Sequence, residues 1–510
     1  MKTAIIRVDA APSIGNGHVV RCIALAEALA DLDFKIAFAC HEATLHSVPQ
    51  LVQSDRDIIL LENAAEWHAE AAAIARHYPH GVDLLVVDHY GLDATFERAC
   101  RPIARKIAAL DDLANRPHDC DVLLDAGAHR RAEHYAGLLS GSCYAYFGPA
   151  YAPVRPEFRR LRVQAQKRRV PIPVCRLLIS FGGTDAKNMT TLAVCAAEKS
   201  RIDVPIDVVI GAGASNQREV EEAAAKVNAH IHRDLGAAEM ANMIMQADMA
   251  IGAAGTTTWE RCCLGLPSLL VVTADNQQAT AKALDQQGAA NIAGKYSEVT
   301  VATLAHEVSL MAEDYVGRQE MAVVGMQLCD GLGSRRMASV LSPPLAADGQ
   351  PVTLRPATEA DLEITFAWQC DPRIRRYFHN SAPPTREDHE AWFERKRTDV
   401  HSIFSIIDHG MQPAGVFRLD PIEHPQDLPA YDVSILVAPD HQRLGLSVAA
   451  FALARNLMPD AELSASVHPE NRASHAMMTS AGYRLRDNRY VASPHKPVTP
   501  TDPEMEAARA

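Results

Sequence analysis

The pattern of apolar positions changes character along this chain of 510 residues. Short apolar runs alternate with stretches of helical spacing up to about residue 148, and the alternation restarts near residue 176 and continues to about residue 341. Such alternation predicts parallel sheets covered by helices on both faces. We therefore expect two doubly wound, Rossmann-like α/β domains, at residues 1–150 and 172–341.

The strands expected in the first domain are 4–8, 35–39, 58–61, 84–88 and 107–110, with a helix at 65–78. Those expected in the second are 176–180, 207–210, 249–251 and 268–272. A stretch rich in proline and arginine, residues 149–173, separates the two sets. We interpret it as a crossover between domains and not as a nucleic-acid-binding arm.

Beyond a linker at 342–351 the pattern predicts a smaller α+β domain over residues 352–492. Its expected strands are 352–355, 403–408, 414–419, 431–437 and 463–467, with helices around 360–369, 386–398 and 471–481. The last segment, 493–510, is rich in proline and charge and is predicted to be a disordered tail.

Composition excludes several classes of partner. The formal net charge of −13 argues against nucleic acid or an anionic membrane as the main partner. Eleven cysteines without a C-x-x-C pair fit neither a disulfide framework nor a zinc site. The 22 histidines show no ligand spacing, so no metal is predicted. With neither a leader nor a long apolar run, we expect a cytoplasmic protein.

The first predicted strand runs into a glycine loop, Gly15-Asn16-Gly17, which is followed by His18 and a helix. Glycines let a ligand approach the backbone, and the N–H groups of a helix start favour an anion. Histidine is the side chain whose ordinary pKa lies closest to neutral pH, so at this place it could take a proton from water. The loop therefore indicates hydrolysis beside a phosphate, although a structural turn with a helix-capping histidine is the alternative.

Polar residues also follow other expected strands of the first domain. Asp9 comes after the first, Asp88-His89-Tyr90-Gly91 after the fourth, and Asp111-Asp112 after the fifth. The carboxyl ends of parallel strands meet at one edge, so these side chains could face one crevice. The alternative for each aspartate is that it caps the following helix.

The second domain carries three glycine-rich turns after its strands, at 181–185, 211–213 and 252–260. Their backbone N–H groups and threonine hydroxyls could hold a diphosphate, and Glu260 could accept from ribose hydroxyls. Together with the loop before His18 they favour a cleft for a nucleotide-activated substrate.

The third domain has a Q-x-x-G-x-S loop at 442–447, N-x-x-S at Asn471 and Ser474, and A-G-Y at 481–483. With Leu354-Arg355-Pro356, Trp368, Asp371-Pro372 and Arg375, this pattern resembles the GNAT superfamily of acetyl-CoA-dependent N-acetyltransferases, particularly members acting on amino-sugar nucleotides. The resemblance implies that acetyl-CoA is held by Val437, Gln442, Arg443, Leu444, Gly445, Leu446, Ser447, Asn471 and Ser474. Met478 stands where many members carry a tyrosine acid.

Residues 1–341 resemble the UDP-sugar hydrolases of the pseudaminic acid pathway, which have the GT-B fold. The matching motifs are R-x-D-x-x-x-x-I-G-x-G-H ending at His18, with Arg21, then D-H-Y-G, D-D, G-P-x-Y-A-P-V-R ending at Arg155, F-G-G-T-D, Glu260 and Asn276-Gln277. The resemblance implies that His18 activates water for inverting attack on the anomeric carbon, without a metal. The implied substrate-binding residues are Asp9, Gly17, Tyr90, Arg155, Gly183, Thr184, Thr257, Glu260, Asn276 and Gln277.

Together these resemblances predict a bifunctional enzyme. Its substrate would be UDP-2,4-diacetamido-2,4,6-trideoxy-β-L-altropyranose, and its third domain would acetylate the 4-amino group of the UDP-linked precursor. One alternative is a GT-B glycosyltransferase in which His18 deprotonates an acceptor hydroxyl. Another is a protein in which one or both sites bind ligand without catalysis, for example a hydrolase whose GNAT domain only binds acetyl-CoA.

Overall fold

The computed structural model describes residues 2–11, 15–53, 56–62, 67–211, 213–378, 380–425 and 428–495. It divides into two compact units, Met1–Leu341 and Ser342–Ala510. The first unit contains two parallel sheets, which we call the first and second lobes, and the second unit contains one mixed sheet.

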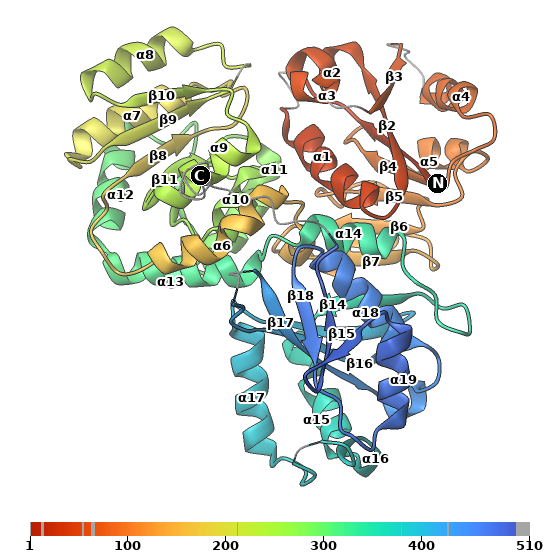
Figure 1. Ribbon diagram of the computed structural model, residues 1–510. Helices are drawn as coiled ribbons and strands as arrows, with labels where there is room; N and C mark the ends of the chain where they lie inside the picture. The colour runs from red at the N-terminus through yellow and green to blue at the C-terminus, as the bar shows by residue number, and fades with distance from the viewer. Residues whose placement is uncertain are drawn as a thin grey trace, which may run out of the picture. The chain divides into compact units, whose positions relative to one another are not determined.

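The first lobe has a seven-stranded parallel sheet in the order β3-β2-β1-β4-β5-β6-β7 (Figure 1). Strands β1 and β4 lie side by side at its centre, and their residues are almost entirely buried. The strands are β1 (Lys2–Val8), β2 (Phe34–His41), β3 (Asp57–Leu61), β4 (Leu84–Asp88), β5 (Ile107–Leu110), β6 (Val122–Asp125) and β7 (Tyr144–Phe147).

Helices cover both faces of this sheet, as expected for crossovers between parallel strands. One core forms between the sheet and α1, and a second core lies on the opposite face beneath α4 and α5. The helices are α1 (Gly17–Ala30), α2 (Glu42–Ser47), α3 (Pro49–Gln53), α4 (Trp67–His77) and α5 (Ala94–Cys100), with short 3₁₀ turns η1 (Ala132–Tyr135) and η2 (Pro149–Tyr151).

The second lobe has a six-stranded parallel sheet in the order β10-β9-β8-β11-β12-β13. Its strands are β8 (Leu177–Ser180), β9 (Ile206–Ile210), β10 (His230–Arg233), β11 (Met249–Ala253), β12 (Ser268–Val272) and β13 (Asn291–Lys295). Its helices are α7 (Met189–Ser200), α8 (Gln217–Lys226), α9 (Ala237–Gln246), α10 (Thr257–Cys263), α11 (Asp275–Gln286), α12 (Val301–Glu313) and α13 (Tyr315–Leu328).

Two helices link the lobes. The predicted crossover at 149–173 contains α6 (Pro156–Arg168), which packs on α9 and α10 of the second lobe. Its buried Arg162 donates to the main-chain oxygens of Cys263, Met326 and Cys329. At the other end α14 (Gly333–Leu341), which the sequence placed in the second domain, returns to the first lobe and packs on α1.

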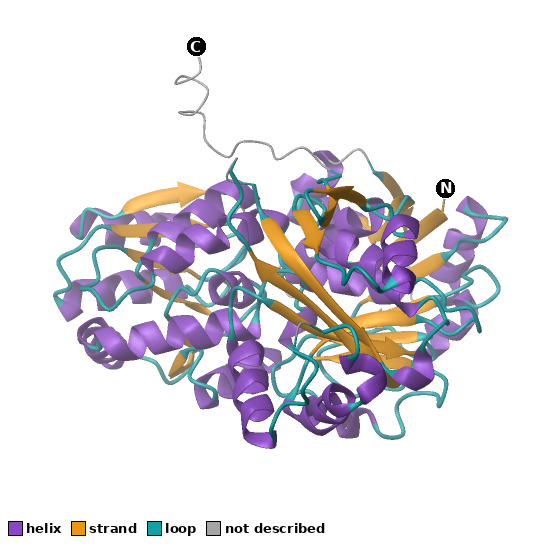
Figure 2. Ribbon diagram, turned by 60° about the horizontal axis from the view of Figure 1, so that its bottom comes forward, coloured by secondary structure: helices purple, strands orange, loops and turns teal. Residues whose placement is uncertain are grey.

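The second unit contains a seven-stranded mixed sheet in the order β14-β15-β16-β17-β18-β20-β19, whose long strands are visible in Figure 2. The strands are β14 (Val352–Pro356), β15 (Ile403–His409), β16 (Gln412–Pro421), β17 (Ala430–Val437), β18 (Glu462–Ala465), β19 (Arg484–Arg486) and β20 (Arg489–Ala492). The helices are α15 (Leu362–Cys370), α16 (Pro372–Arg375), α17 (Arg386–Thr398), α18 (Leu446–Leu457) and α19 (Arg472–Ser480), with 3₁₀ turns η3 (Glu359–Asp361) and η4 (Pro439–His441).

The fold class predicted from the sequence is confirmed, and every predicted strand is present. The sequence missed β6, β7, β10, β13, β19 and β20, and it missed α6. Strands β10 and β13 lie at sheet edges and contain polar residues, so they lack a continuous apolar run. Residues 65 and 66 of the predicted helix, and 496–510 of the predicted tail, lie outside the described residues.

Candidate active sites

The strand order of each lobe of the first unit reverses at one place, and ligands of open α/β sheets bind there. In the first lobe the reversal lies between β1 and β4, and in the second between β8 and β11. His18 follows β1, and Asp88 ends β4. The glycine loops at 181–185 and 252–260 follow β8 and β11. The fold therefore brings the predicted catalytic and nucleotide-binding loops to the two positions where a site is expected.

His18 lies in the first turn of α1 and is buried. Its Nδ1 atom lies 2.6 Å from Asp88 Oδ1. Asp88 is itself buried and also accepts from Arg21 Nε at 2.7 Å and from Cys22 Sγ at 3.2 Å. Burial alone would raise the pKa of Asp88, but the charges of Arg21 and His18 outweigh it and hold that pKa well below its usual value. A carboxylate paired to Nδ1–H leaves Nε2 as the basic atom of the ring.

Tyr90 lies beside this pair. Its ring meets the His18 ring edge to face, with the centroids 4.4 Å apart. Its hydroxyl donates to Asp112 Oδ2 at 3.1 Å, and Arg21 Nη1 donates to the same oxygen at 3.2 Å. Burial, followed by the charge of Asp112, raises the pKa of Tyr90, so this side chain is a neutral hydrogen-bonding group.

The sequence assigned no role to Asp88, Arg21 or Asp112, although all three fall in the motifs that it singled out. The structure joins them to His18 and Tyr90 in one network. The available signal was the position of both aspartates at the carboxyl ends of neighbouring strands β4 and β5. The pairing to His18 requires a contact across 70 residues of sequence.

Asp9 lies in a separate buried network. Its carboxylate contacts Arg7 Nη1 at 2.7 Å, His41 Nδ1 at 2.8 Å and the Thr44 hydroxyl at 3.1 Å. Glu70 accepts from Arg7 Nε at 2.8 Å and completes the cluster. Both oxygens of Asp9 therefore have partners within the protein, which fits a role in holding the loop after β1. Residues 12–14 of that loop lie outside the described residues.

Loops of the two lobes meet beside His18. A Cβ placed on Gly17 would lie 3.2 Å from Thr256 Oγ1, and one placed on Gly183 would lie 2.7 Å from Asn16 Nδ2. Asn276 Nδ2, at the start of α11, donates to the Tyr90 hydroxyl at 2.7 Å. The predicted substrate-binding residues Gly17, Tyr90, Gly183 and Asn276 therefore lie at one junction between the lobes.

Further predicted residues line the second-lobe side of this junction. Glu260, buried in α10, accepts from Arg155 Nε at 2.8 Å. Thr257 begins α10, and a Cβ placed on Gly213 would lie 3.3 Å from Thr184 Cγ2. Residue 212 of the turn predicted at 211–213 lies outside the described residues. Gln277 is hydrogen-bonded to Thr273, whose N–H and hydroxyl both donate to Gln277 Oε1. Glu260 and Arg155 thus form one charged pair beside the glycine loops.

In the second unit the predicted cofactor loop connects β17 to α18. Arg443 and Gly445 have positive φ angles of 66° and 79°, and Gly445 caps α18 in the left-handed conformation. The first N–H groups of a helix lack intrahelical acceptors, so Leu446 and Ser447 present donors at the end of this turn. Gln442 Nε2 lies 3.5 Å from the Val437 carbonyl oxygen and closes the loop. A turn of this kind can bind a pyrophosphate.

Strands β17 and β18 separate beside this loop. Their parallel pairing covers only residues 430–432 and 462–464, although β17 continues to Val437. The unpaired part of β17 on this side can accept an extended ligand by main-chain hydrogen bonds. Asn471 caps α19 by accepting from the Ser474 N–H at 3.1 Å. Met478, on the same helix, is buried and supplies no proton donor.

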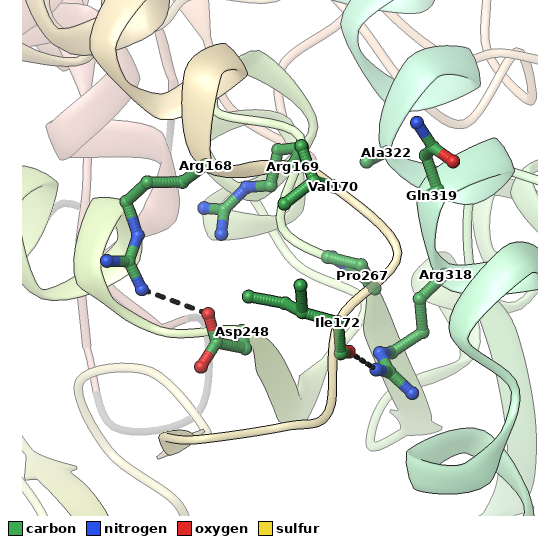
Figure 3. A pocket seen from close by; sticks show the side chains of 9 residues that line it. All are labelled: Arg168, Arg169, Val170, Ile172, Asp248, Pro267, Arg318, Gln319 and Ala322. Carbon is green, nitrogen blue, oxygen red and sulfur yellow. Dashed lines mark hydrogen bonds and ion pairs between the residues drawn. The ribbon is translucent and has the colours of Figure 1, made fainter.

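One pocket in the second lobe lies away from these sites (Figure 3). It is lined by residues of α6, α13 and the segments leading into β11 and β12, at the amino ends of those strands. Its arginines are held by protein oxygens: Arg168 by Asp248, Arg169 by three main-chain carbonyls, and Arg318 by Met311, Ala312 and Ile172. We interpret these contacts as structural, because they hold α6 and α13 against the rest of the second lobe.

Within the described ranges no group of three or more His, Cys, Asp or Glu side chains could hold a metal ion. The eleven cysteines are free thiols. No helix in the described part of the chain has both the length and the apolar character needed to cross a bilayer.

Family models match one segment in each of the two units. Residues 352–484 match the model of an acetyltransferase (GNAT) domain, and residues 177–323 match the glycosyltransferase family 28 C-terminal domain. A GNAT domain implies the use of acetyl-CoA.

Three curated relatives cover different parts of the chain. An uncharacterised protein of Methanocaldococcus jannaschii is 22% identical over 425 residues, 80% of this chain and 81% of that protein, so the match includes residues of both units. The UDP-2,4-diacetamido-2,4,6-trideoxy-beta-L-altropyranose hydrolase of Campylobacter jejuni is 25% identical over 288 residues, 56% of this chain and 96% of that enzyme. The spore coat polysaccharide biosynthesis protein SpsG of Bacillus subtilis is 29% identical over 206 residues, 40% of this chain and 59% of that protein.

Among solved structures, MurG of Acinetobacter baumannii superimposes with a TM-score of 0.50 at 18% identity, covering 67% of this chain and 99% of MurG. At this identity the likeness shows the fold alone. The chain thus joins a two-lobed GT-B module, homologous to the Campylobacter hydrolase and to SpsG, to a GNAT acetyltransferase domain.

Proposed function

We propose that the first unit hydrolyses a UDP-linked hexose at the anomeric carbon. The observation that carries this proposal is the 2.6 Å contact between His18 Nδ1 and the buried Asp88 carboxylate, because it leaves Nε2 of His18 to accept a proton. Water attacks the anomeric carbon and gives its proton to Nε2. The bond from that carbon to the phosphate oxygen breaks, and its electron pair leaves with UDP.

The leaving group needs electrostatic stabilisation more than a second acid, because UDP departs as an anion. The start of α1 and the loops at Gly183 and Gly211 supply backbone donors, and Glu260 can accept from ribose hydroxyls. Tyr90 and Asn276, already bonded to each other beside His18, would hold the sugar. The Campylobacter relative is named for a diacetamido-trideoxy-altropyranose linked to UDP, which we propose as the substrate here.

For the second unit we propose acetyl transfer from acetyl-CoA to the 4-amino group of the UDP-linked precursor. The turn at 442–447 would bind the pyrophosphate, and the open side of β17 would pair with the pantetheine arm. The amine nitrogen attacks the thioester carbon, loses a proton, and CoA leaves as its thiolate. The product would be the substrate of the first unit.

The hydrolytic proposal is tested with His18→Asn in the full chain. We expect UDP release from the UDP-diacetamido sugar to be abolished while UDP still binds, because the substitution removes the base and leaves the glycine loops intact. Mass spectrometry of the products, started from the UDP-4-amino sugar with and without acetyl-CoA, follows both reactions at once. Near-normal turnover in the variant would exclude His18 from the mechanism.

The acetyl-CoA site is tested with Gly445→Glu, which places a charged side chain in the turn. Gly349→Glu is the matched control, because Gly349 has a similar φ of 84° and, like Gly445, open space where a Cβ would lie. We expect acetyl-CoA affinity to be lost only in Gly445→Glu. Equal affinity in the two variants would place the cofactor elsewhere.

A second candidate is supported by the match to a glycosyltransferase family model over residues 177–323. In that reaction His18 would remove the proton of an acceptor hydroxyl instead of water. Consumption of the UDP-sugar with no acceptor present distinguishes hydrolysis from transfer.

A further inference from the structure

Two loops of the first lobe, those that follow β5 and β6, carry buried polar atoms without hydrogen-bond partners. Asp112 follows β5, and His129 lies in the loop that follows β6. Asp112 Oδ1 and both ring nitrogens of His129 are buried, and none has a hydrogen-bond partner among the described residues. A buried polar atom without a partner costs about 1–3 kcal/mol, so such atoms usually mark a place for a ligand or for ordered water.

These atoms adjoin the proposed catalytic network. The other carboxylate oxygen of Asp112 accepts from the Tyr90 hydroxyl at 3.1 Å, and Tyr90 packs on His18. Arg130, next to His129, donates from Nη2 to the main-chain oxygen of Asp112 at 2.5 Å and ties the two loops together. The loops that carry the unpaired atoms are therefore connected to Tyr90 and His18 by hydrogen bonds and ring contact.

The hydrogen-bonding capacity of the two residues is complementary to an amide. Burial, followed by the charge of Arg130, lowers the pKa of His129 to about 4, so its ring is neutral and carries one N–H donor. Asp112 Oδ1 can only accept. A secondary amide offers one N–H to the carboxylate and one C=O to the imidazole.

The charges around Asp112 and His129 favour a neutral amide over a protonated amine. Arg21 already pairs with Asp112, with 3.2 Å between Nη1 and Oδ2, and Arg130 flanks His129. An ammonium group would meet two guanidinium groups, and it has no acceptor to offer the N–H of the imidazole. A neutral acetamido group meets neither difficulty.

We propose that Asp112 and His129 form a subsite that recognises an acetamido substituent of the UDP-linked sugar. This inference rests on the proposed hydrolysis and deepens it. Acetylation by the second unit converts an ammonium into the group that this subsite accepts, so hydrolysis follows acetylation. Asp112 and His129 act here as specificity-determining residues.

The experiment uses the full chain and three variants. His129→Phe keeps a planar ring and removes both nitrogens, whereas His129→Asn retains one donor and one acceptor. His77→Phe is the matched control, because His77 is exposed at the end of α4. For each protein kcat/KM is measured with the UDP-diacetamido sugar and with the UDP-sugar that carries a free 4-amino group, and UDP affinity is measured by calorimetry.

We expect His129→Phe to lower kcat/KM for the diacetamido compound by about tenfold to a hundredfold and to reduce the preference over the amino compound by a similar factor. UDP affinity should stay within about twofold. His129→Asn should recover part of the loss, and His77→Phe should match the unaltered protein. An unchanged preference in His129→Phe would overturn the inference.

A binding measurement separates this inference from the hydrolytic proposal. In a His18→Asn background the diacetamido compound should bind more tightly than UDP, and His129→Phe should remove most of that difference. Absence of UDP release from the unaltered protein would refute the proposed hydrolysis, and this binding difference would then decide the subsite alone. Equal affinities for UDP and the UDP-sugar would refute the subsite.

Discussion

The Asp88→Asn substitution is the sharpest test of the catalytic network. Asparagine has nearly the same shape as aspartate, but it carries no charge. Its amide NH₂ would replace one of the two oxygens that accept from His18, Arg21 and Cys22. His18 Nδ1 would then become an acceptor and Nε2 would carry the proton, which removes the base. The corresponding change in serine protease triads lowers kcat by about 10⁴. We expect a loss of about 10³ to 10⁴ in kcat for UDP release, with UDP affinity nearly unchanged.

The same substitution should lower stability. Asp88 is buried and pairs with Arg21, whose side chain is only 12% exposed. Breaking a buried ion pair costs about 3–5 kcal/mol. Arg21 retains Asp112, so we expect about 3 kcal/mol, measured by urea unfolding. Because the pKa of Asp88 is lowered in the folded state, its contribution is present above about pH 4 and is lost at lower pH. The variant should therefore be less sensitive to acid.

Asp119→Asn is the control for this experiment. Asp119 also pairs with arginines, Arg98 at 3.1 Å and Arg101 at 2.9 Å, but it is partly exposed. Such pairs contribute about 0–1 kcal/mol, and we expect full activity. If Asp88→Asn kept kcat within tenfold of the unaltered enzyme, with the same pH profile, the proposed role of the Asp88–His18 pair would be wrong.

Two further predictions concern the first unit. A Cβ on Gly211 would lie 2.5 Å from both Cα and O of Gly183, so Gly211→Ala should displace the Gly183 loop; calorimetry should show UDP affinity at least about tenfold weaker, and an unchanged affinity would contradict the placement of UDP. Burial lowers the pKa of His118, but the hydrogen bonds and charges of Asp111 and Glu97 have a larger effect and raise that pKa to about 9. A raised pKa gives stability that is complete below about pH 6.5 and is lost as the pH rises to 9, so urea unfolding should show a fall of about 3 kcal/mol over this range that is absent in His118→Gln.

Several strands that are buried on both faces are predicted accurately from the sequence. The predicted ranges for β4, β5 and β12 agree with the structure to the residue, because each is a continuous apolar run bounded by polar residues. The helix at 386–398 also agrees, since Thr385 caps its first turn by accepting from the Asp388 N–H. The edge strand β10, His230–Arg233, carries no such signal.

The candidate site divides in the same way. His18 and the glycine loops can be identified from residue type alone. Few residues other than histidine can exchange a proton near neutral pH, and few other than glycine adopt positive φ angles. Asp9 and Asp88 have the same local signal, an aspartate after a buried strand, yet Asp9 binds Arg7, His41 and Thr44 whereas Asp88 binds His18. Their different partners are set by the packing of side chains distant in sequence, which local pattern does not encode.

Met478 occupies the position at which many GNAT members carry a tyrosine acid, and the effect of that difference on the proposed acetylation can be worked out. Acetyl transfer to an amine involves two proton movements: the amine must lose one, and the thiolate of CoA can gain one. An ordinary thiol has a pKa of about 8.5, so its thiolate leaves without assistance near neutral pH, whereas an alkyl ammonium with a pKa near 10 must be deprotonated before it can attack. General acid catalysis contributes about 10²- to 10⁴-fold, and least where the leaving group is already a weak base. A buried methionine at this position therefore leaves without assistance only the protonation of the CoA thiolate, which is the less demanding of the two proton transfers. The proposed acetylation depends chiefly on how the amine is deprotonated.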